Sequence, residues 1–180
     1  MNYKITLKES IKQAIDIIKL DGKVIEKVSK DSNALIMGIL IIVIGSVINQ
    51  ILNLNIIVLL ITPIIVLVAY FLITLITHGL ARLFGGTASY IEYFRAESHA
   101  AILSWSGILA IIPFLGNVII FFISIWRLIV SVVILQNVHK LPRNKAIIVV
   151  LIPVILSILL VFIASFFYFG TANPNALLPN

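Results

Sequence analysis

Five side chains of this chain have the types that acid–base catalysis or zinc binding requires. Zinc sites use two or three histidines with a carboxylate, at spacings that bring the side chains to one point. Glu97 and His99 are only two residues apart, so they diverge on a helix, and no H-E-x-x-H motif is present. We therefore predict that the protein is not an enzyme, holds no metal or cofactor, and uses these groups to cap helices at a water boundary. The five are His78, Glu92, Glu97, His99 and His139.

Arg127 is a sixth chemically active side chain, and it lies within a long apolar run. A charge near the middle of a membrane costs about 2.5–3.5 kcal/mol on insertion scales, so Arg127 should have partners. A tight turn at Leu115–Asn117 would place Arg127 opposite residues 104–106 of an antiparallel hairpin, with Glu97 too far along to pair. We predict that the hydroxyl of Ser104 or Ser106, backbone carbonyls of the third span and the ring of Trp105 hold Arg127, either to pin the helix register or in a solute pathway. The predicted intramembrane polar cluster is Ser104, Trp105, Ser106, Ser124, Arg127 and Ser131.

The composition indicates a membrane protein. Of the 180 residues, 61% are hydrophobic and 11% are charged, whereas a soluble domain is about half apolar and a quarter charged. Apolar runs of about twenty residues recur, and such runs suit a hydrocarbon core about 30 Å thick. Cysteine is absent, which excludes disulfides and thiolate chemistry.

We predict an all-α integral membrane protein with five transmembrane helices in one domain, residues 34–169. A flexible extracytoplasmic tail, residues 170–180, should follow the last span. The predicted spans are 34–52, 56–77, 101–115, 118–138 and 146–169.

Small residues in the first span should let a neighbouring helix approach closely. A hairpin between the first two spans would set Gly45 opposite Pro63 and Gly38 opposite Tyr70. Pro63 removes a backbone hydrogen bond and should kink the second span. A polar stripe at helical spacing should face the inside of the bundle, and it consists of Tyr70, Thr74 and Thr77.

The net charge is +6, and its distribution indicates membrane orientation rather than nucleic-acid binding. Every Lys and Arg except Arg127 lies in residues 1–33, 78–100 or 139–145. Positive charge gathers in the cytoplasmic loops of membrane proteins. We therefore predict a cytoplasmic N-terminus, an extracytoplasmic C-terminus and a location in the cell membrane.

Residues 1–33 predict an amphipathic cytoplasmic segment. Thr6 and Glu9 have the spacing of a capping box, and Asp21-Gly22 should end the helix that follows. That helix could lie in the membrane interface, pack on the protein's own inner loops, or enter a partner's groove. Its apolar stripe is Leu7, Ile11, Ala14, Ile15 and Ile18.

Residues 78–100 form the longest polar interruption after the first span. Gly85-Gly86 predicts a tight turn that needs a positive φ, and it lacks the Lys pattern of a phosphate loop. Ser89 and Glu92 have capping-box spacing, so a helix should begin at Tyr90 and run into the third span. With the basic loop 139–145, this stretch predicts a cytoplasmic surface for a partner protein or lipid headgroups. The candidate surface is Arg82, Gly85, Gly86, Ser89, Glu92, His139, Lys140, Arg143 and Lys145.

Several short motifs follow one another in the second half of the chain. They are Leu83-Phe84-Gly85-Gly86-Thr87, Pro113 with Gly116, Trp126, His139-x-Leu141 and Lys145-Ala146. With the five-span plan, they resemble the Ypt-interacting-protein (Yip) domain family over about residues 34–165. The resemblance implies a five-span fold with a cytoplasmic N-terminus and, in eukaryotic members, binding of prenylated Rab-type GTPases during vesicle formation. The short N-terminal segment is similar to that of prokaryotic members, many of which have no assigned function.

Three functions follow from these patterns. The first is a membrane scaffold or adaptor of the Yip type, which binds a partner in membrane trafficking or organisation. The second is a small oligomeric transporter or channel, because proline-broken helices often line transport pathways. The third is a membrane-embedded metal-dependent enzyme. We take the first as the hypothesis, with the lipid bilayer, an unidentified membrane or cytoplasmic protein and a second copy of the chain as candidate partners.

Overall fold

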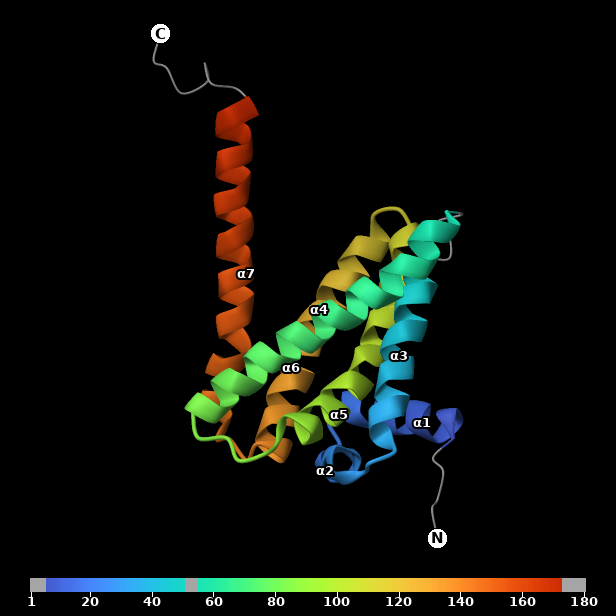
Figure 1. Cartoon of the computed structure of the whole chain (residues 1–180), viewed down its shortest axis with the longest axis vertical. Helices are drawn as coiled ribbons and strands as arrows, with labels where there is room; N and C mark the ends of the chain where they lie inside the picture. The colour runs from blue at the N-terminus through green and yellow to red at the C-terminus, as the bar shows by residue number, and fades with distance from the viewer. Residues whose placement is uncertain (1–5, 51–54, 173–180) are drawn as a thin grey trace.

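The structure is a computed structural model that describes residues 6–50 and 55–172, and this part contains helices and no strand. The predicted all-α class is therefore confirmed. In chain order the elements are α1 (Leu7–Ile18), α2 (Gly22–Lys30), α3 (Ala34–Asn49), α4 (Ile56–Leu83), α5 (Tyr90–Ala100), the 3₁₀ helix η1 (Ala101–Ile111), α6 (Leu115–Val138) and α7 (Arg143–Ala172) (Figure 1).

Side-chain caps begin the helices that the sequence marks. Thr6 and Glu9 form a complete capping box at α1, and Ser89 and Glu92 form a second at α5, so both predicted capping boxes are confirmed. Asp21 accepts hydrogen bonds from two backbone amides at the start of α2. These caps satisfy amides that have no partner inside their own helix.

Three described helices are long and apolar enough to cross a membrane: α4, α6 and α7 over Arg143–Tyr168. A fourth span results if α2 and α3, which meet at 109°, count as one broken helix. The predicted second, fourth and fifth spans thus correspond to α4, α6 and α7, each longer than expected. Residues 170–172 of the predicted tail continue α7, and residues 173–180 lie outside the described residues.

The predicted third span is not an α-helix through residue 115. Its residues form the 3₁₀ helix η1, which follows α5 directly and stops at Ile111, then a turn at residues 112–114 and the first residue of α6. Small residues recur every third position in η1, at Ala101, Ser104 and Gly107. A 3₁₀ helix has three residues per turn and aligns such positions on one side. This narrow side packs on α3, where Asn49 donates from Nδ2 to the Ser104 carbonyl at 3.0 Å and lies against Gly107.

The glycines of α3 face α5 and η1, so the predicted pairing with α4 is wrong. A methyl group on Gly38 would meet the Ser98 hydroxyl at 1.9 Å, and one on Gly45 would meet Ser104 at 2.7 Å. The Trp105 indole N–H donates to the Ile41 carbonyl at 2.9 Å across the same contact. The glycines of α3 therefore allow close approach of α5 and η1, while other residues of α3 pack on α4.

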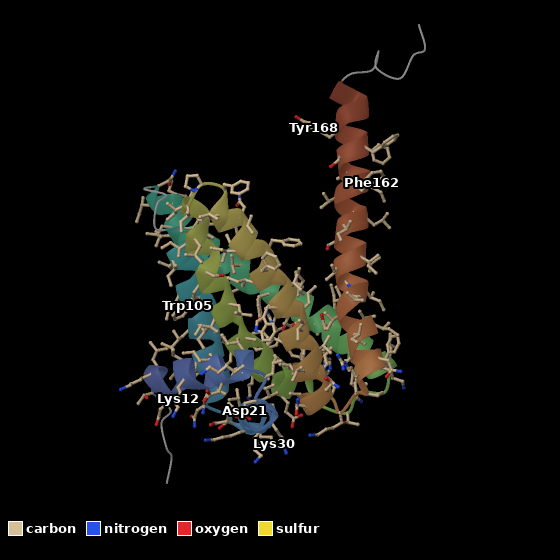
Figure 2. The ribbon with its side chains drawn as sticks, turned by 180° about the vertical axis from the view of Figure 1, so that it is seen from behind. Lys12, Asp21, Lys30, Trp105, Phe162 and Tyr168 are labelled. Carbon is tan, nitrogen blue, oxygen red and sulfur yellow. The ribbon has the colours of Figure 1, made fainter. Side chains whose placement is uncertain are left out.

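Burial is greatest at the end of the molecule where α1 and α2 lie across α3, α5 and α6 (Figure 1). We call this end the polar platform and define it as α1, α2 and residues 84–92 and 139–145. Charged side chains gather there, as Lys12, Asp21 and Lys30 illustrate in Figure 2. The fully buried core residues beneath the platform include Ile17, Ile25, Val28, Tyr93, Ile134 and Leu135.

The opposite end is far less packed. Helix α7 contacts α4 and α6 near its start and then diverges from them (Figure 1). Val149 and Val150 are buried, whereas nearly every side chain from Ile155 to Tyr168 is exposed. An apolar helix exposed in this way has lipid as its solvent.

The contact between α3 and α5 predicts a difference between two glycines. Gly38→Ala should destabilise the protein by about 1–3 kcal/mol, because the added methyl overpacks the contact. Gly79→Ala is the matched control, because a methyl there meets nothing within 4 Å and alanine has the better helix propensity by up to about 1 kcal/mol. Thermal unfolding in detergent measures both variants. Equal melting temperatures for the two would contradict the contact.

Candidate functional site

Arg127 lies at the centre of a polar cluster between α4, α5 and α6. Its guanidinium forms an ion pair with Glu97 on α5. It also donates to the Tyr70 hydroxyl at 2.8 Å and to the Ser131 hydroxyl at 3.0 Å. Ser131 in turn donates to Glu97 at 2.9 Å, and the Tyr70 hydroxyl donates to the Glu97 carbonyl. Four side chains from three helices thus form one hydrogen-bonded network.

The predicted partners of Arg127 are mostly wrong, and the reason is the position of a turn. The turn was expected at Leu115–Asn117, but α6 already begins at Leu115 and the turn occupies Ile112–Phe114. In an antiparallel hairpin, a turn three residues earlier moves the partner of each α6 residue about six positions earlier along α5 and η1. Glu97 therefore lies beside Arg127, and the predicted mismatch between them does not occur.

The other members of the predicted cluster have separate partners. Trp105 bonds to α3, Ser106 donates to the Leu103 carbonyl at 2.6 Å, and Ser124 donates to the Ile120 carbonyl at 2.8 Å. Ser131, which was placed in the cluster but not named as a partner of Arg127, does accept a hydrogen bond from it. Ser104, Ser106 and Ser124 instead line a cavity that Arg127 also borders. The predicted cluster omitted two members of the network, Glu97 and Tyr70, although Tyr70 belongs to the polar stripe on α4.

The ion pair adds a polar contact to the packing of α5 on α6. Glu97 is 4% exposed and its second carboxylate oxygen is buried without a partner among the described residues. Removing one member of a buried pair leaves the other charge uncompensated, which costs about 3–5 kcal/mol. The pair therefore fixes the register of α6 against α5, and Tyr70 extends that constraint to α4.

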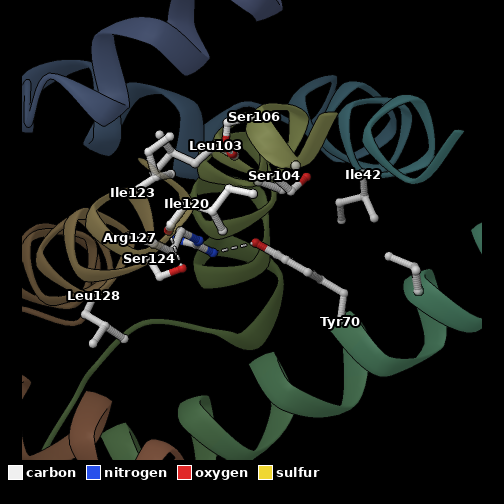
Figure 3. A pocket seen from close by; sticks show the side chains of 13 residues that line it. Ile42, Tyr70, Leu103, Ser104, Ser106, Ile120, Ile123, Ser124, Arg127 and Leu128 are labelled. Carbon is white, nitrogen blue, oxygen red and sulfur yellow. Dashed lines mark hydrogen bonds between the residues drawn. The ribbon is translucent and has the colours of Figure 1, made fainter. Parts of the chain in front are cut away.

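Beside the pair is a cavity of about 430 Å³ (Figure 3). Its walls come from α3, α4, η1 and α6 and are mostly aliphatic, with Ile42, Val66, Leu103 and Ile123 among them. Polar groups converge where the Tyr70 hydroxyl meets the Arg127 guanidinium (Figure 3). Of the predicted cluster, Ser104, Ser106 and Ser124 thus share a cavity with Arg127 without bonding to it, whereas Ser131 bonds to it and Trp105 does neither.

At the platform, His139 joins three segments. Its carbonyl accepts from the Thr87 amide at 3.2 Å, and its ring Nε2 lies 3.2 Å from Nδ1 of His78. Burial, His78 and Arg82 lower the pKa of His139 to about 4, so the ring is neutral at neutral pH. A methyl on Gly86 would meet His139 Nδ1 at 2.6 Å. Gly86 is therefore needed for close approach, while Gly85 supplies the predicted positive φ at 96°.

The predicted surface residues divide into those that bond within the protein and those whose side chains are exposed. Several bind the platform itself: Arg82 donates to the Gly86 and Thr87 carbonyls, both at 3.2 Å, and Lys145 donates to the Phe84 carbonyl at 3.0 Å. Ser89 and Glu92 are engaged in their cap. Arg143 is exposed at the start of α7.

Sequence reasoning missed the contribution of α2 to this surface. Glu26 lies 3.3 Å from Lys140 and 2.9 Å from Lys30, and hydrogen bonds from these lysines lower the pKa of the Glu26 carboxyl. Where α2 packs on α5 and the end of α6, a cavity of about 210 Å³ lies between them, with Glu92 and Asn137 on the side away from α2. The short amphipathic pattern of residues 22–30 was the available signal.

Helix α1 packs on the protein rather than standing free. Ser10, Ala14 and Ile17 are buried, and the Trp126 indole N–H donates to the Ile18 carbonyl at 2.9 Å. Of the predicted stripe, Leu7 and Ile15 remain 39% and 37% exposed. Helix α1 therefore packs on this protein's own helices, chiefly α5, α2, α3 and η1, rather than on its inner loops, and part of the stripe stays exposed.

Comparison with known proteins gives one family. The model of the Yip1 domain matches residues 28–165. No curated protein and no solved structure matches the chain.

The Arg127–Glu97 pair predicts a non-additive pair of substitutions. Glu97→Leu and Arg127→Leu should each destabilise the protein by about 3–5 kcal/mol, because each leaves a buried charge without its partner. The double variant should recover much of that loss, since no charge remains. Thermal unfolding in one detergent measures all four proteins. Additive losses in the double variant would show that the pair does not act as a unit.

Proposed function

The chain belongs to the Yip1 domain family, and on that premise we propose that it is a multi-span membrane scaffold whose polar platform binds a partner protein at the cytoplasmic face. The protein is an integral membrane protein with several apolar helices. The proposal makes it an adaptor rather than an enzyme. The functional surface is then the outer side of α1 and α2, with Lys140 and Arg143 beside them.

The observation that carries this proposal is the contrast between the two ends of the molecule. The platform is tied together by the Thr87–His139 and Lys145–Phe84 hydrogen bonds and by the Lys140–Glu26 ion pair. A dense core lies beneath it, whereas the lipid-facing ends of α4, α6 and α7 are loosely associated. A densely packed polar surface carried by more exposed apolar helices suits presentation of a fixed set of charges to a partner.

The charges of the platform favour a protein partner over lipid headgroups or nucleic acid. Residues 1–33 contain seven lysines but also five acidic residues. Surfaces that recognise anionic lipid use clusters of about 4–8 Lys or Arg that are not balanced by acids. Mixed charges at fixed positions suit a protein surface of complementary pattern. Lys12, Lys23 and Lys27 are exposed and point away from the core.

We infer that this scaffold crosses the cell membrane five times and that its platform lies on the cytoplasmic side. In addition to α4, α6 and α7, the continuous rod of α5 and η1 is about 38 Å long, because a 3₁₀ helix rises about 2.0 Å per residue. Helix α3 spans about 24 Å over its described length. The positive charge of the platform supports its cytoplasmic location.

Capture of the partner should depend on the outward lysines. We expect a photoreactive residue at Ser32 to cross-link a discrete protein in native membranes. Lys12→Gln, Lys23→Gln and Lys27→Gln together should reduce that adduct about fivefold or more, a loss of about 1 kcal/mol in binding. The matched control replaces the same three lysines by Arg and keeps the charge, so its adduct should persist. Adducts to lipid alone, or an unchanged adduct in the Gln variant, would contradict the proposal.

Topology can be tested with single cysteines, because the chain has none of its own. An impermeant thiol reagent added to intact cells should label Asn117→Cys, at the start of α6, and should not label Asn144→Cys in the basic loop. Permeabilised cells provide the control, since both positions are exposed and should then react. Labelling of Asn144→Cys but not Asn117→Cys in intact cells would reverse the orientation.

A further inference from the structure

The cavity beside Arg127 lies where a lipid could enter it. Its walls combine α3 and α4 on one side with η1 and α6 on the other. Helix α4 packs on α3, α5 and α7 but has little contact with α6 or η1. The cavity therefore lies in a seam between helices of the membrane region. Its volume of about 430 Å³ falls within the range of about 300–1,000 Å³ that small-molecule sites occupy.

The lining of the cavity is mostly apolar. Most of its lining is aliphatic, and the polar groups belong to Tyr70, Arg127 and three serines. The Arg127 side chain remains 23% exposed although it is paired, and it borders this cavity. Ser104 lends only its carbonyl to a hydrogen bond, so its hydroxyl is unused among the described residues. An occupant would thus have an apolar body and a polar group at the Arg127 end.

The charge of the site selects the kind of polar group. Glu97 already balances Arg127, so the pair is neutral as a unit. An anionic group would leave one uncompensated negative charge in an apolar cavity, and a cationic group would meet the guanidinium. Either arrangement has a desolvation cost that nothing there offsets. A hydroxyl avoids that cost, because it can accept from the guanidinium and donate to a serine.

We propose that this cavity binds a neutral membrane lipid with a free hydroxyl group, of the diacylglycerol type. The hydroxyl lies at Arg127, Tyr70 and Ser104, and the acyl chains leave between α4 and α6. The site is separate from the platform, so it does not depend on the identity of the protein partner.

The test uses the full-length protein in liposomes with a diazirine-bearing diacylglycerol as the probe. A phosphatidic acid with the same diazirine chain is the anionic comparison. Ile123→Trp fills the cavity from α6. Ile125→Trp, two residues along and 42% exposed to lipid, is the matched control. Ser124→Phe is a second filling variant, and circular dichroism with thermal unfolding shows which variants are folded.

Photolabelling is measured by intact-protein mass spectrometry and mapped by peptide. We expect Ile123→Trp and Ser124→Phe to lose diacylglycerol labelling about fivefold or more, while Ile125→Trp retains the wild-type amount. Phosphatidic acid labelling should be equally low in all four proteins. Equal diacylglycerol labelling of the four proteins would show only surrounding lipid and overturn the site. Phosphatidic acid labelling that equals the wild-type diacylglycerol signal and falls in the filling variants would overturn the neutral class. If Ile123→Trp does not fold, Ser124→Phe decides the outcome.

Discussion

A charge inside an apolar medium must be paired, and this constraint organises the membrane part of the protein. The Arg127–Glu97 pair joins α6 to α5, and Tyr70 brings α4 into the same network. Lipid provides no hydrophobic force between apolar helices, so helix register has to come from close packing or polar contacts. The glycine contact of α3 with α5 and η1 is the close-packed part. The ion pair with Tyr70 is the polar part. The two kinds of contact together connect α3, α4, α5, η1 and α6.

The hydrophobic effect operates on this chain only where water is near. The platform buries Ile17, Ile25 and Val28 of α1 and α2 against the ends of α5 and α6. Burying such a side chain from water contributes about 1.5–3 kcal/mol. The same side chains in the far half of α7 gain nothing by leaving lipid. The uneven packing of the two ends thus follows from the two solvents.

Much of the fold could be predicted from single residues and local patterns. Capping boxes located the starts of α1 and α5, and apolar runs located α4, α6 and α7. Long-range pairing could not be predicted in the same way. An error of three residues in the turn before α6 was enough to hide Glu97 as the partner of Arg127. The 3₁₀ helix had a usable signal in the small residues Ala101, Ser104 and Gly107. A spacing of three is close to the 3.6-residue period of an α-helix, so the two are easily confused in sequence.

The partner-binding surface remains a prediction, but the structure shows what its residues contact. Positive charge in short loops predicted a cytoplasmic location, and it could not predict the role of each residue. Arg82 and Lys145 donate to backbone carbonyls of the turn before α5, so they build the platform instead of presenting charge. Gly86 and His139 are also internal, since the His139 ring is buried and a methyl group on Gly86 would collide with it. In the proposed function, α1 and α2 present the charges to the partner. Their lysines are exposed because their apolar faces are buried. A residue's charge therefore indicates which side of the membrane it occupies, and only its contacts determine whether it serves the fold or the partner.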